Sequence, residues 1–553
     1  MSRLLPIDRL QLLAGILWIA TQLPFLTSAF RIDDTYFLAV TRQIYQHPLD
    51  PYGFQINWDG KPEWAFKTLA NPPLVPAYLA AWHCLFPWNE VSFHLAVLPF
   101  SLTALFAFGS VARNFGVEPL TAQVLLCCSP AFFLGSQVIM QDVPMLSFFL
   151  LAVSSAMLYE SQGTSATLTV SFLAAFCCPL AKYNGLVLVP VLLGLVLAGN
   201  RKRGLVAIAC APLVALLFWS CFTWFRYGQN HFLAMAAFEK NPMARAPFWE
   251  ILVGTLAATG LGVLPLCLLD FMRRVPKWDK TLWASAVVIL PSVWGFGTSL
   301  GYGKSSSLLL AISVWLALQL IGLALLCGWN FYRRKQITGL ILVAWMLCGL
   351  VFQAGLLFSS VRYVLFIGPP AILLVLGQSS RFPRKRTLGF LVGVNLLLIV
   401  IVAVGDSRLA DGYREIVVQK IRPWRTGQQG KFYFSGHWGF QYYSEQLGGE
   451  SVDETAPPVL KLGDLMVVAK TAWPDVLRPR AEEGQKICTT VIQFNPHWLV
   501  RTVDCQGGAN FYASRTYGCR HPTFLPFGFS RGPGETFLVH QVQHANESAG
   551  CDP

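Results

Sequence analysis

A succession of long apolar stretches between residues 1 and 405 constrains this chain more than any other feature. A helix needs about 20 mainly apolar residues to cross the hydrocarbon core of a bilayer. Only 13% of the residues are charged, where a soluble domain averages about 25%. The pattern therefore predicts a polytopic α-helical protein embedded in a lipid bilayer, with residues 406–553 forming a soluble domain.

About thirteen membrane spans can be assigned to these stretches from their length and hydropathy. They lie near residues 10–30, 92–112, 119–137, 143–159, 165–181, 183–199, 204–225, 249–270, 281–300, 308–328, 337–358, 361–378 and 388–405. The stretch 73–88 is apolar but short and contains Pro87, so we expect a helix at the outer interface that does not cross. The predicted domains are a transmembrane domain over 1–405 and a soluble domain over 406–553.

Much of the basic charge of the chain, whose net charge is +13, lies in short clusters between apolar stretches. Cytoplasmic loops carry such an excess of lysine and arginine. This predicts a cytoplasmic N-terminus and an extracytoplasmic C-terminal domain, in a plasma or inner membrane. We see no basic groove or nucleic-acid motif, and so expect no nucleic-acid partner. The clusters are Arg201-Lys202-Arg203, Arg273-Arg274, Arg333-Arg334-Lys335 and Arg384-Lys385-Arg386.

The soluble domain contains strand signals at residues 431–435 and 465–470, which predict an α/β or mostly β fold. The aromatic stretch 436–443 is either a packed core or a contact for an acceptor or glycan near the membrane surface. An even number of cysteines in an extracytoplasmic domain permits two disulfides, in three possible pairings. These cysteines are Cys488, Cys505, Cys519 and Cys551.

The first outer connection, residues 31–73, is much longer than the roughly 4–6 residues of an ordinary connection. It begins with an adjacent acidic pair, Asp33 and Asp34, and ends in Asn71-Pro72-Pro73. Between them lie several aromatic residues and the cations Lys61 and Lys67. Long ordered loops are usually functional, so we expect the active site here.

Three more charged residues lie at outer ends of predicted spans: Asp142, Lys182 and Arg362. Transfer of a sugar from a lipid phosphate needs a carboxylate base and cations that stabilise the departing phosphate. Aromatic surfaces can pack against the sugar ring, and the outer residues include all three kinds.

Each of these residues also has a structural interpretation. The pair Asp33-Asp34 and Asp142 could each cap a helix. Lys182 could extend its ammonium group to the membrane interface, and Arg362 could pair with a carboxylate of the C-terminal domain.

Five sequence motifs occur in a fixed order on the outer side. They are F-R-I-D-D-T-Y-F at 30–37, N-P-P-L-V-P-A-Y-L at 71–79, Q-D-V-P-M-L at 141–146, P-L-A-K-Y-N-G at 179–185 and R-Y-V-L-F-I-G-P-P at 362–370. Together they resemble the glycosyltransferase-C superfamily. Within it, the protein O-mannosyltransferases and the lipid A aminoarabinose transferases look most similar, over roughly residues 10–370.

This resemblance implies a cell-envelope enzyme that transfers a sugar, with inversion, from a polyprenyl-phosphate donor to an extracytoplasmic protein, lipid or glycan acceptor. It implies that Asp33 is the catalytic base and that Asp142 is a second acid that shapes the site. Asp34 stands where these families usually have glutamate, and it is expected to be a catalytic residue that supports Asp33.

The resemblance also implies substrate contacts. Asn71 replaces the charged residue of the usual Lys- or His-Pro-Pro motif and is expected to bind the substrate, and Lys61 or Lys67 could supply the phosphate contact of the missing charge. Four further residues of the motifs are expected to bind the substrate: Lys182, Tyr183, Arg362 and Tyr363. No ligand spacing requires a metal; whether a divalent cation takes part is left open.

Two other functions remain alternatives. A transporter or flippase of lipid-linked glycans predicts charged residues along a path inside several spans, together with inverted repeats. A non-catalytic membrane scaffold would use the C-terminal domain as a binding module, and the carboxylates of residues 31–73 would then be dispensable.

Overall fold

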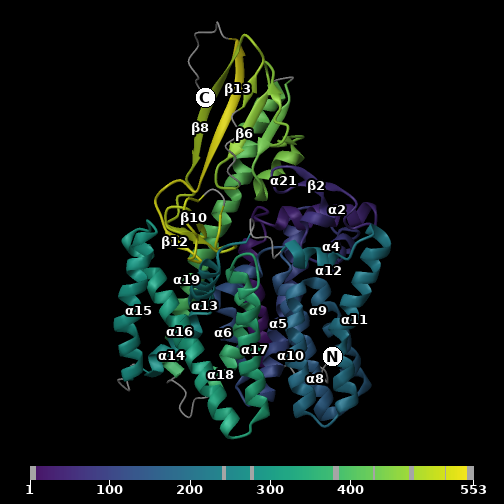
Figure 1. Ribbon diagram of the computed structural model, residues 1–553, viewed down its shortest axis with the longest axis vertical. Coiled ribbons are helices and arrows are strands. Elements are labelled where there is room, and N and C mark those ends of the chain that lie inside the picture. Colours follow the sequence, from purple (N-terminus) through teal and green to yellow (C-terminus); the bar gives the residue numbers. More distant parts are fainter. Residues whose placement is uncertain are drawn as a thin grey trace.

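The computed structural model describes residues 8–238, 245–274, 279–377, 385–427, 430–472, 479–516 and 519–544. A bundle of helices forms one end of the molecule, and a sheet built from C-terminal residues stands on the other end (Figure 1). Within the described ranges, seven helices are long and apolar enough to cross a membrane, or eight if one bent pair is a single span. The predicted polytopic helical fold is confirmed, and of the α/β or mostly β alternatives for the C-terminal domain the structure shows a mixed sheet with helices; the count of thirteen spans stays a prediction.

Each predicted span coincides with one or two helices of the bundle. The long helices are α5 (Glu90–Asn114), α8 (Asp142–Gln162), α11 (Lys202–Tyr227), α15 (Lys280–Ser299), α16 (Lys304–Arg333), α17 (Ile337–Ala354) and α19 (Lys385–Glu415). The shorter ones are α1 (Arg9–Gln22), α6 (Pro119–Cys127), α7 (Pro130–Gly135), α9 (Ser165–Ala181), α10 (Leu188–Ala198), α13 (Phe248–Gly262), α14 (Leu264–Arg274) and α18 (Gly368–Gly377).

The helices of the bundle approach one another closely at small residues, and apolar side chains also cover its periphery. A Cβ on Gly260 of α13 would lie 1.9 Å from the carbonyl oxygen of Ser313 in α16. Only glycine allows the two backbones to approach so closely. At the periphery, Val287 and Val288 of α15 are exposed although apolar, as expected of side chains that face lipid.

The segment after α1 forms a layer on the end of the bundle that faces the sheet (Figure 1). It contains α2 (Asp34–Gln46), the hairpin of β1 (Gln55–Asn57) and β2 (Pro62–Trp64), α3 (Ala65–Thr68) and α4 (Leu74–His83). Ten residues give α4 a length of about 15 Å, half the thickness of a bilayer core. The stretch 73–88, predicted as an interfacial helix, thus contains a helix too short to cross.

Two of the basic clusters, Arg201–Arg203 and Arg333–Lys335, are at the end of the bundle opposite the sheet. The end of α11 reaches the 31–73 layer, because the Tyr227 hydroxyl donates to Asp50 Oδ1 over 2.9 Å. The start of α11, next to Arg201–Arg203, is therefore at the far end. The same holds for Arg333–Lys335, since α17 begins just after this cluster and ends beside the 31–73 layer.

The C-terminal domain contains a five-stranded mixed sheet in the order β4-β3-β6-β13-β8. Its strands are β3 (Phe432–Ser435), β4 (Glu450–Ser451), β6 (Leu465–Ala469), β8 (Gln485–Phe494) and β13 (Glu535–His544). Strands β3 and β6 coincide with the two predicted from the sequence, and pair in parallel. Helix α21 (Trp438–Gln446) includes most of the aromatic stretch, of which Phe440 is fully buried.

Three of the four cysteines of this domain are disulfide-bonded. Cys505 and Cys519 form one disulfide with each other. Cys488 of β8 is also disulfide-bonded, and Cys551 lies outside the described residues. Of the three pairings that the sequence left open, the structure therefore contains the one with the Cys505–Cys519 bond.

Helix α19 connects the two parts without a break at residue 405, so the predicted domain boundary lies inside a helix. A buried cluster fixes the helix there. Asp406 of α19 forms an ion pair with Arg31 and accepts hydrogen bonds from the hydroxyls of Thr502 (2.6 Å) and Tyr512 (2.7 Å). The 31–73 segment, α19 and the C-terminal domain thus meet at one carboxylate.

Candidate active site

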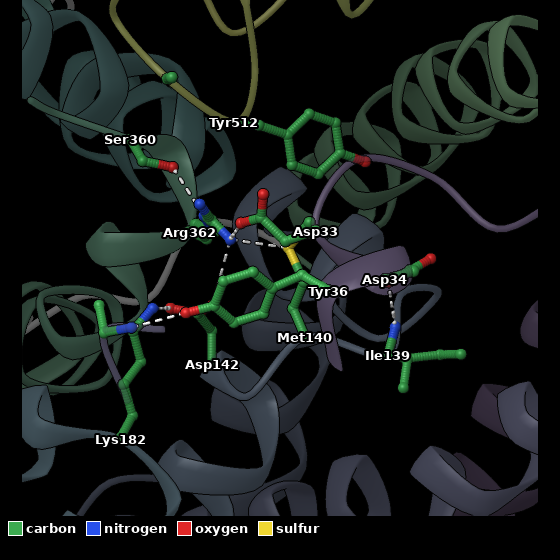
Figure 2. Close-up of polar contacts among 12 residues, drawn as sticks. Asp33, Asp34, Tyr36, Ile139, Met140, Asp142, Lys182, Ser360, Arg362 and Tyr512 are labelled. Atoms are coloured by element: carbon green, nitrogen blue, oxygen red, sulfur yellow. Dashed lines mark hydrogen bonds and ion pairs between the residues drawn. The ribbon is translucent and has the colours of Figure 1, made fainter. Parts of the chain in front are cut away.

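Four charged residues from separate parts of the chain converge between the bundle and the C-terminal domain (Figure 2). Asp33 precedes α2, Asp142 is the first residue of α8, and Lys182 follows α9. Arg362 belongs to a 3₁₀ turn, Val361–Phe366, between α17 and α18. Each residue stands where a helix begins or ends, which places its charge at the end of the bundle that faces the C-terminal domain.

The four side chains form an alternating row of acids and cations. Arg362 Nη1 lies 2.8 Å from Asp33 Oδ2 and 3.9 Å from Asp142 Oδ2. Lys182 Nζ lies 2.6 Å from Asp142 Oδ1. Arg362, Lys182 and Asp142 are buried, whereas 26% of the Asp33 side chain is exposed. The charges balance within the row, and Asp33 is its most accessible member.

Neighbouring groups orient the two cations. Arg362 Nε donates to the Ser360 hydroxyl over 3.3 Å, and Nη1 lies 2.8 Å from Met140 Sδ (Figure 2). The ring of Tyr363 lies 4.7 Å from Lys182 Nζ and 5.7 Å from the Arg362 guanidinium carbon. Cation–π contacts at these distances add to the ion pairs in holding both cations.

Asp34 turns away from this row. Its carboxylate accepts hydrogen bonds from the backbone N–H of Arg31 (3.0 Å) and of Ile139 (2.8 Å). It is fully buried, and burial raises its pKa to about 7. Asp34 ties the start of α2 to the segment between α7 and α8, so the structure gives it a structural position although the sequence grouped it with the catalytic acids.

A cavity of about 610 Å³ opens beside the row. Asp33, Lys182, Arg362 and Tyr363 line its charged part, and Asn71 and Tyr183 are also on its wall. The apolar part comes from the end of α17, the residues after it and α12 (His231–Phe238). These apolar lining residues include Val351, Phe352, Leu356, Phe358, Phe232 and Met235.

The other predicted substrate contacts lie differently. Lys61 is exposed at the hairpin and pairs with Glu63 over 2.9 Å, and it does not line the cavity. Lys67 lines a separate pocket beside Asp50 and Arg226. The Tyr183 hydroxyl forms hydrogen bonds with His231 Nδ1 (2.7 Å) and Trp219 Nε1 (2.9 Å). These bonds hold Tyr183 in the wall of the cavity.

No group of three or more His, Cys, Asp or Glu side chains that could hold a metal ion occurs among the described residues. The acids of the row are instead matched by Arg362 and Lys182.

Part of the cavity wall comes from residues that the motifs did not indicate. Asn510, Tyr512, Arg515 and Thr516 reach the cavity from the loop closed by the Cys505–Cys519 disulfide. Their sequence neighbourhood carries no pattern that predicts a site. Only the docking of the C-terminal domain on the bundle brings them there.

Comparisons with known proteins give structural neighbours only. No protein-family model and no curated protein matches the chain. Its structure is similar to ArnT from Cupriavidus metallidurans bound to undecaprenyl phosphate, with 15% identity and a TM-score of 0.39 over 83% of this chain and 92% of that one. It is similar to the same protein in the apo state, with 14% identity and a TM-score of 0.37 over 82% and 92%. A third is the Archaeoglobus fulgidus oligosaccharyltransferase in complex with zinc and sulfate, with 12% identity and a TM-score of 0.45 over 84% and 68%.

Proposed function

We propose that this protein is a membrane glycosyltransferase that moves a sugar from a polyprenyl-phosphate donor to an acceptor on the extracytoplasmic side. One observation carries the proposal. An accessible carboxylate, Asp33, and two buried cations, Arg362 and Lys182, share a cavity that has an apolar wall next to a membrane helix. A base, a phosphate site and a place for a lipid chain are what this reaction needs.

In the proposed reaction, an acceptor hydroxyl oxygen attacks the anomeric carbon of the donor sugar. Asp33 takes the hydroxyl proton as general base. The bond between the anomeric carbon and the phosphate oxygen breaks, its electron pair stays on that oxygen, and polyprenyl phosphate leaves. Attack opposite the leaving group inverts the configuration of the sugar.

Asp33 suits the base better than Asp142. Asp33 lines the cavity, whereas Asp142 does not and only 4% of its side chain is exposed. Asp142 contacts both cations and holds them side by side. We therefore assign Asp142 a positioning role.

Arg362 and Lys182 would bind the phosphate and stabilise the charge that grows on it as the sugar departs. A phosphate on Arg362 competes with Asp33 for the guanidinium group, since Arg362 Nη1 now binds Asp33 Oδ2. Donor binding would thus free the carboxylate for the acceptor proton. Asn71 and Tyr363 line the same space and remain candidate donor contacts, while Lys61 and Lys67 have no place in the proposed phosphate site.

The apolar wall suits the polyprenyl chain. Val351 and Phe352 belong to α17, a candidate membrane span, and Leu356 follows it. A lipid chain along these residues would keep its hydrocarbon in the membrane while the phosphate reaches Arg362.

The test is incubation of the purified protein with a panel of polyprenyl-phosphate sugars, measuring released polyprenyl phosphate. Asp33→Asn should lower the rate by about 100- to 10,000-fold, the usual worth of a general base. Arg362→Ala should reduce turnover by about 100-fold or more, as for a lost transition-state donor. Glu63→Gln, which removes a carboxylate of the same segment outside the cavity, should leave the rate unchanged.

Two outcomes would count against the proposal. Normal turnover by folded Asp33→Asn protein would remove the assigned base. Movement of intact lipid-linked sugar across vesicle membranes, without release of lipid phosphate, would favour the flippase. The charges of the site gather at the end of the bundle that faces the C-terminal domain, which supports a transferase more than a transport path through the bundle.

A further inference from the structure

The end of the cavity next to the C-terminal domain is built from two segments far apart in the sequence. One is the tip of the β1–β2 hairpin, which contributes Trp58 and Asp59. The other is the turn between β3 and α21, which contributes His437 and Trp438. Neither segment takes part in the proposed reaction, and the sequence leaves the role of the stretch 436–443 open between a packed core and a contact for an acceptor or glycan.

Hydrogen bonds dock the hairpin on the C-terminal domain. Asn57 Nδ2 donates to the carbonyl of Val452 over 2.7 Å, and Gln441 Nε2 donates to the carbonyl of Asn57 over 3.3 Å. The backbone N–H of Glu454 donates to the carbonyl of Gly60 over 2.8 Å. Trp58 and Asp59 lie between these anchors, so their backbone position is fixed.

Aromatic rings line this end. The Trp58 ring centroid lies 5.2 Å from that of His437 and 5.4 Å from that of Tyr36, and all three residues line the cavity. Burial lowers the pKa of His437 to about 4, so its ring is neutral at neutral pH. The surface is therefore aromatic and uncharged apart from Asp59.

Trp438 adopts a left-handed backbone conformation with φ of 61°, which a bulky side chain rarely takes. Two hydrogen bonds hold the turn in place: the Thr35 hydroxyl donates to the carbonyl of Trp438 over 2.6 Å, and the N–H of His437 donates to the carbonyl of Ala472 over 2.9 Å. Strain that the surroundings enforce commonly accompanies function. Here it places Trp438 in the wall of the cavity.

Asp59 supplies the polar group. It is exposed and lines the cavity, and no cation among the described residues forms an ion pair with it. A carboxylate accepts strong hydrogen bonds from hydroxyl groups. Its negative charge would repel a phosphate, so this end of the cavity suits a neutral ligand rich in hydroxyls.

We propose that Trp58, Asp59, His437 and Trp438 form a subsite for a sugar ring. The apolar C–H face of the ring would pack on the indoles, and ring hydroxyls would donate to Asp59. The inference deepens the proposed function and rests on it for the source of the ring. That ring is either the donor sugar, extending outward from a phosphate at Arg362, or a glycan of the acceptor.

Direct binding tests the subsite without any transfer reaction. The full-length protein in lipid nanodiscs is mixed with methyl glucoside, galactoside, mannoside or arabinoside, and saturation-transfer NMR measures binding. We expect at least one glycoside to bind. Asp59→Asn and Trp58→Ala should each lower its affinity about tenfold or more, the loss expected when a charge-assisted hydrogen bond is removed. Glu63→Gln and Trp64→Ala change the same hairpin outside the cavity and should bind as the unmodified protein does.

Kinetics then identify the source of the ring. A rise in KM for the polyprenyl-phosphate sugar in Asp59→Asn assigns the subsite to the donor, and a rise in KM for the acceptor assigns it to the acceptor glycan. Asp59→Asn alters an exposed group, so it keeps the test valid if Trp58→Ala does not fold. Equal glycoside binding by Asp59→Asn and the unmodified protein, or no glycoside binding at all, overturns the subsite. Glycoside binding without turnover of any lipid-linked sugar would instead refute the proposed function alone.

Discussion

Asp33 and Asp34 are neighbours in the sequence, but their side chains differ in exposure and in hydrogen-bond partners. Asp33 points into the cavity and pairs with Arg362, while Asp34 accepts two backbone hydrogen bonds in the interior. A turn at Ile32, whose φ is 47°, precedes the pair, and α2 begins at Asp34. The backbone direction at this helix start therefore decides which carboxylate is available for chemistry.

The buried position of Asp34 predicts how the stability of the protein changes with pH. Because burial raises its pKa to about 7 from an ordinary value of 3.8, the folded protein binds its proton more tightly than the unfolded chain does. The contribution of Asp34 to stability is therefore present at low pH and is lost as pH rises from about 4 to about 7. Asp34→Asn cannot ionise, so its unfolding temperature should approach or pass that of the unmodified protein as pH rises through this range.

The measurement is thermal unfolding of both proteins in detergent at a series of pH values. The amide that replaces the carboxyl group in Asp34→Asn offers one acceptor oxygen to two N–H groups, so at low pH the substitution should cost about 1–3 kcal/mol. A gap between the two unfolding temperatures that stays constant from pH 4 to pH 7 would contradict the buried, proton-binding position of Asp34.

At the scale of elements, the loop closed by Cys505–Cys519 supports the segment that carries Arg362. The N–H of Val361 donates to the carbonyl of Phe511 over 3.2 Å, and the N–H of Ser514 donates to the carbonyl of Ser359 over 2.8 Å. A disulfide that closes a loop of this length restricts the conformations of the unfolded chain, which stabilises the folded state by about 3 kcal/mol in the entropic model. The loop is thereby held against residues 359–361.

We expect the double substitution Cys505→Ser and Cys519→Ser to raise KM for the lipid-linked donor by about tenfold, because Arg362 would lose its fixed support. A loss of about 1.4 kcal/mol in binding corresponds to this factor. Steady-state kinetics over a range of donor concentrations measure it. Cys84→Ser removes an exposed free cysteine elsewhere and serves as the control. An unchanged KM in the double variant would show that the loop position does not depend on the bond.

At the scale of the whole molecule, orientation follows from the charge distribution. Arg201–Arg203 and Arg333–Lys335 lie at the end of the bundle opposite the sheet domain. The positive-inside rule then predicts that this end is cytoplasmic and that the sheet domain is outside. The proposed reaction depends on it, since the cavity faces the sheet domain.

Labelling of single cysteines tests the orientation in intact cells. Lys461→Cys lies on the exposed surface of the C-terminal domain and Arg334→Cys in an exposed turn of a basic cluster. A membrane-impermeant thiol reagent should label position 461 in intact cells and position 334 only after permeabilisation. The reverse pattern would place the cavity in the cytoplasm and exclude an extracytoplasmic acceptor.

Local sequence patterns were enough to predict the helical architecture and several residues of the candidate site. Hydrophobic stretches indicate the helices because lipid offers no hydrogen-bond partners, so each span must satisfy its backbone N–H and C=O groups internally as a helix. The length and low polarity of such a helix can be read from the sequence. The same logic predicted β3 and β6. The sequence also predicted four site residues together, because all four are charged residues at the predicted outer ends of spans, where an unpaired charge is costly. They are Asp33, Asp142, Lys182 and Arg362.

Tertiary structure alone decided which of these charges share a cavity and what covers it. Lys61 and Lys67 belong to the same segment as Asp33, yet the fold of the hairpin and α3 directs them elsewhere. The ion pair of Arg31 with Asp406 joins residues 375 positions apart, and the approach of Trp58 to His437 likewise joins the 31–73 segment to the C-terminal domain. No periodicity or spacing encodes such contacts, because they depend on how the C-terminal domain docks on the bundle.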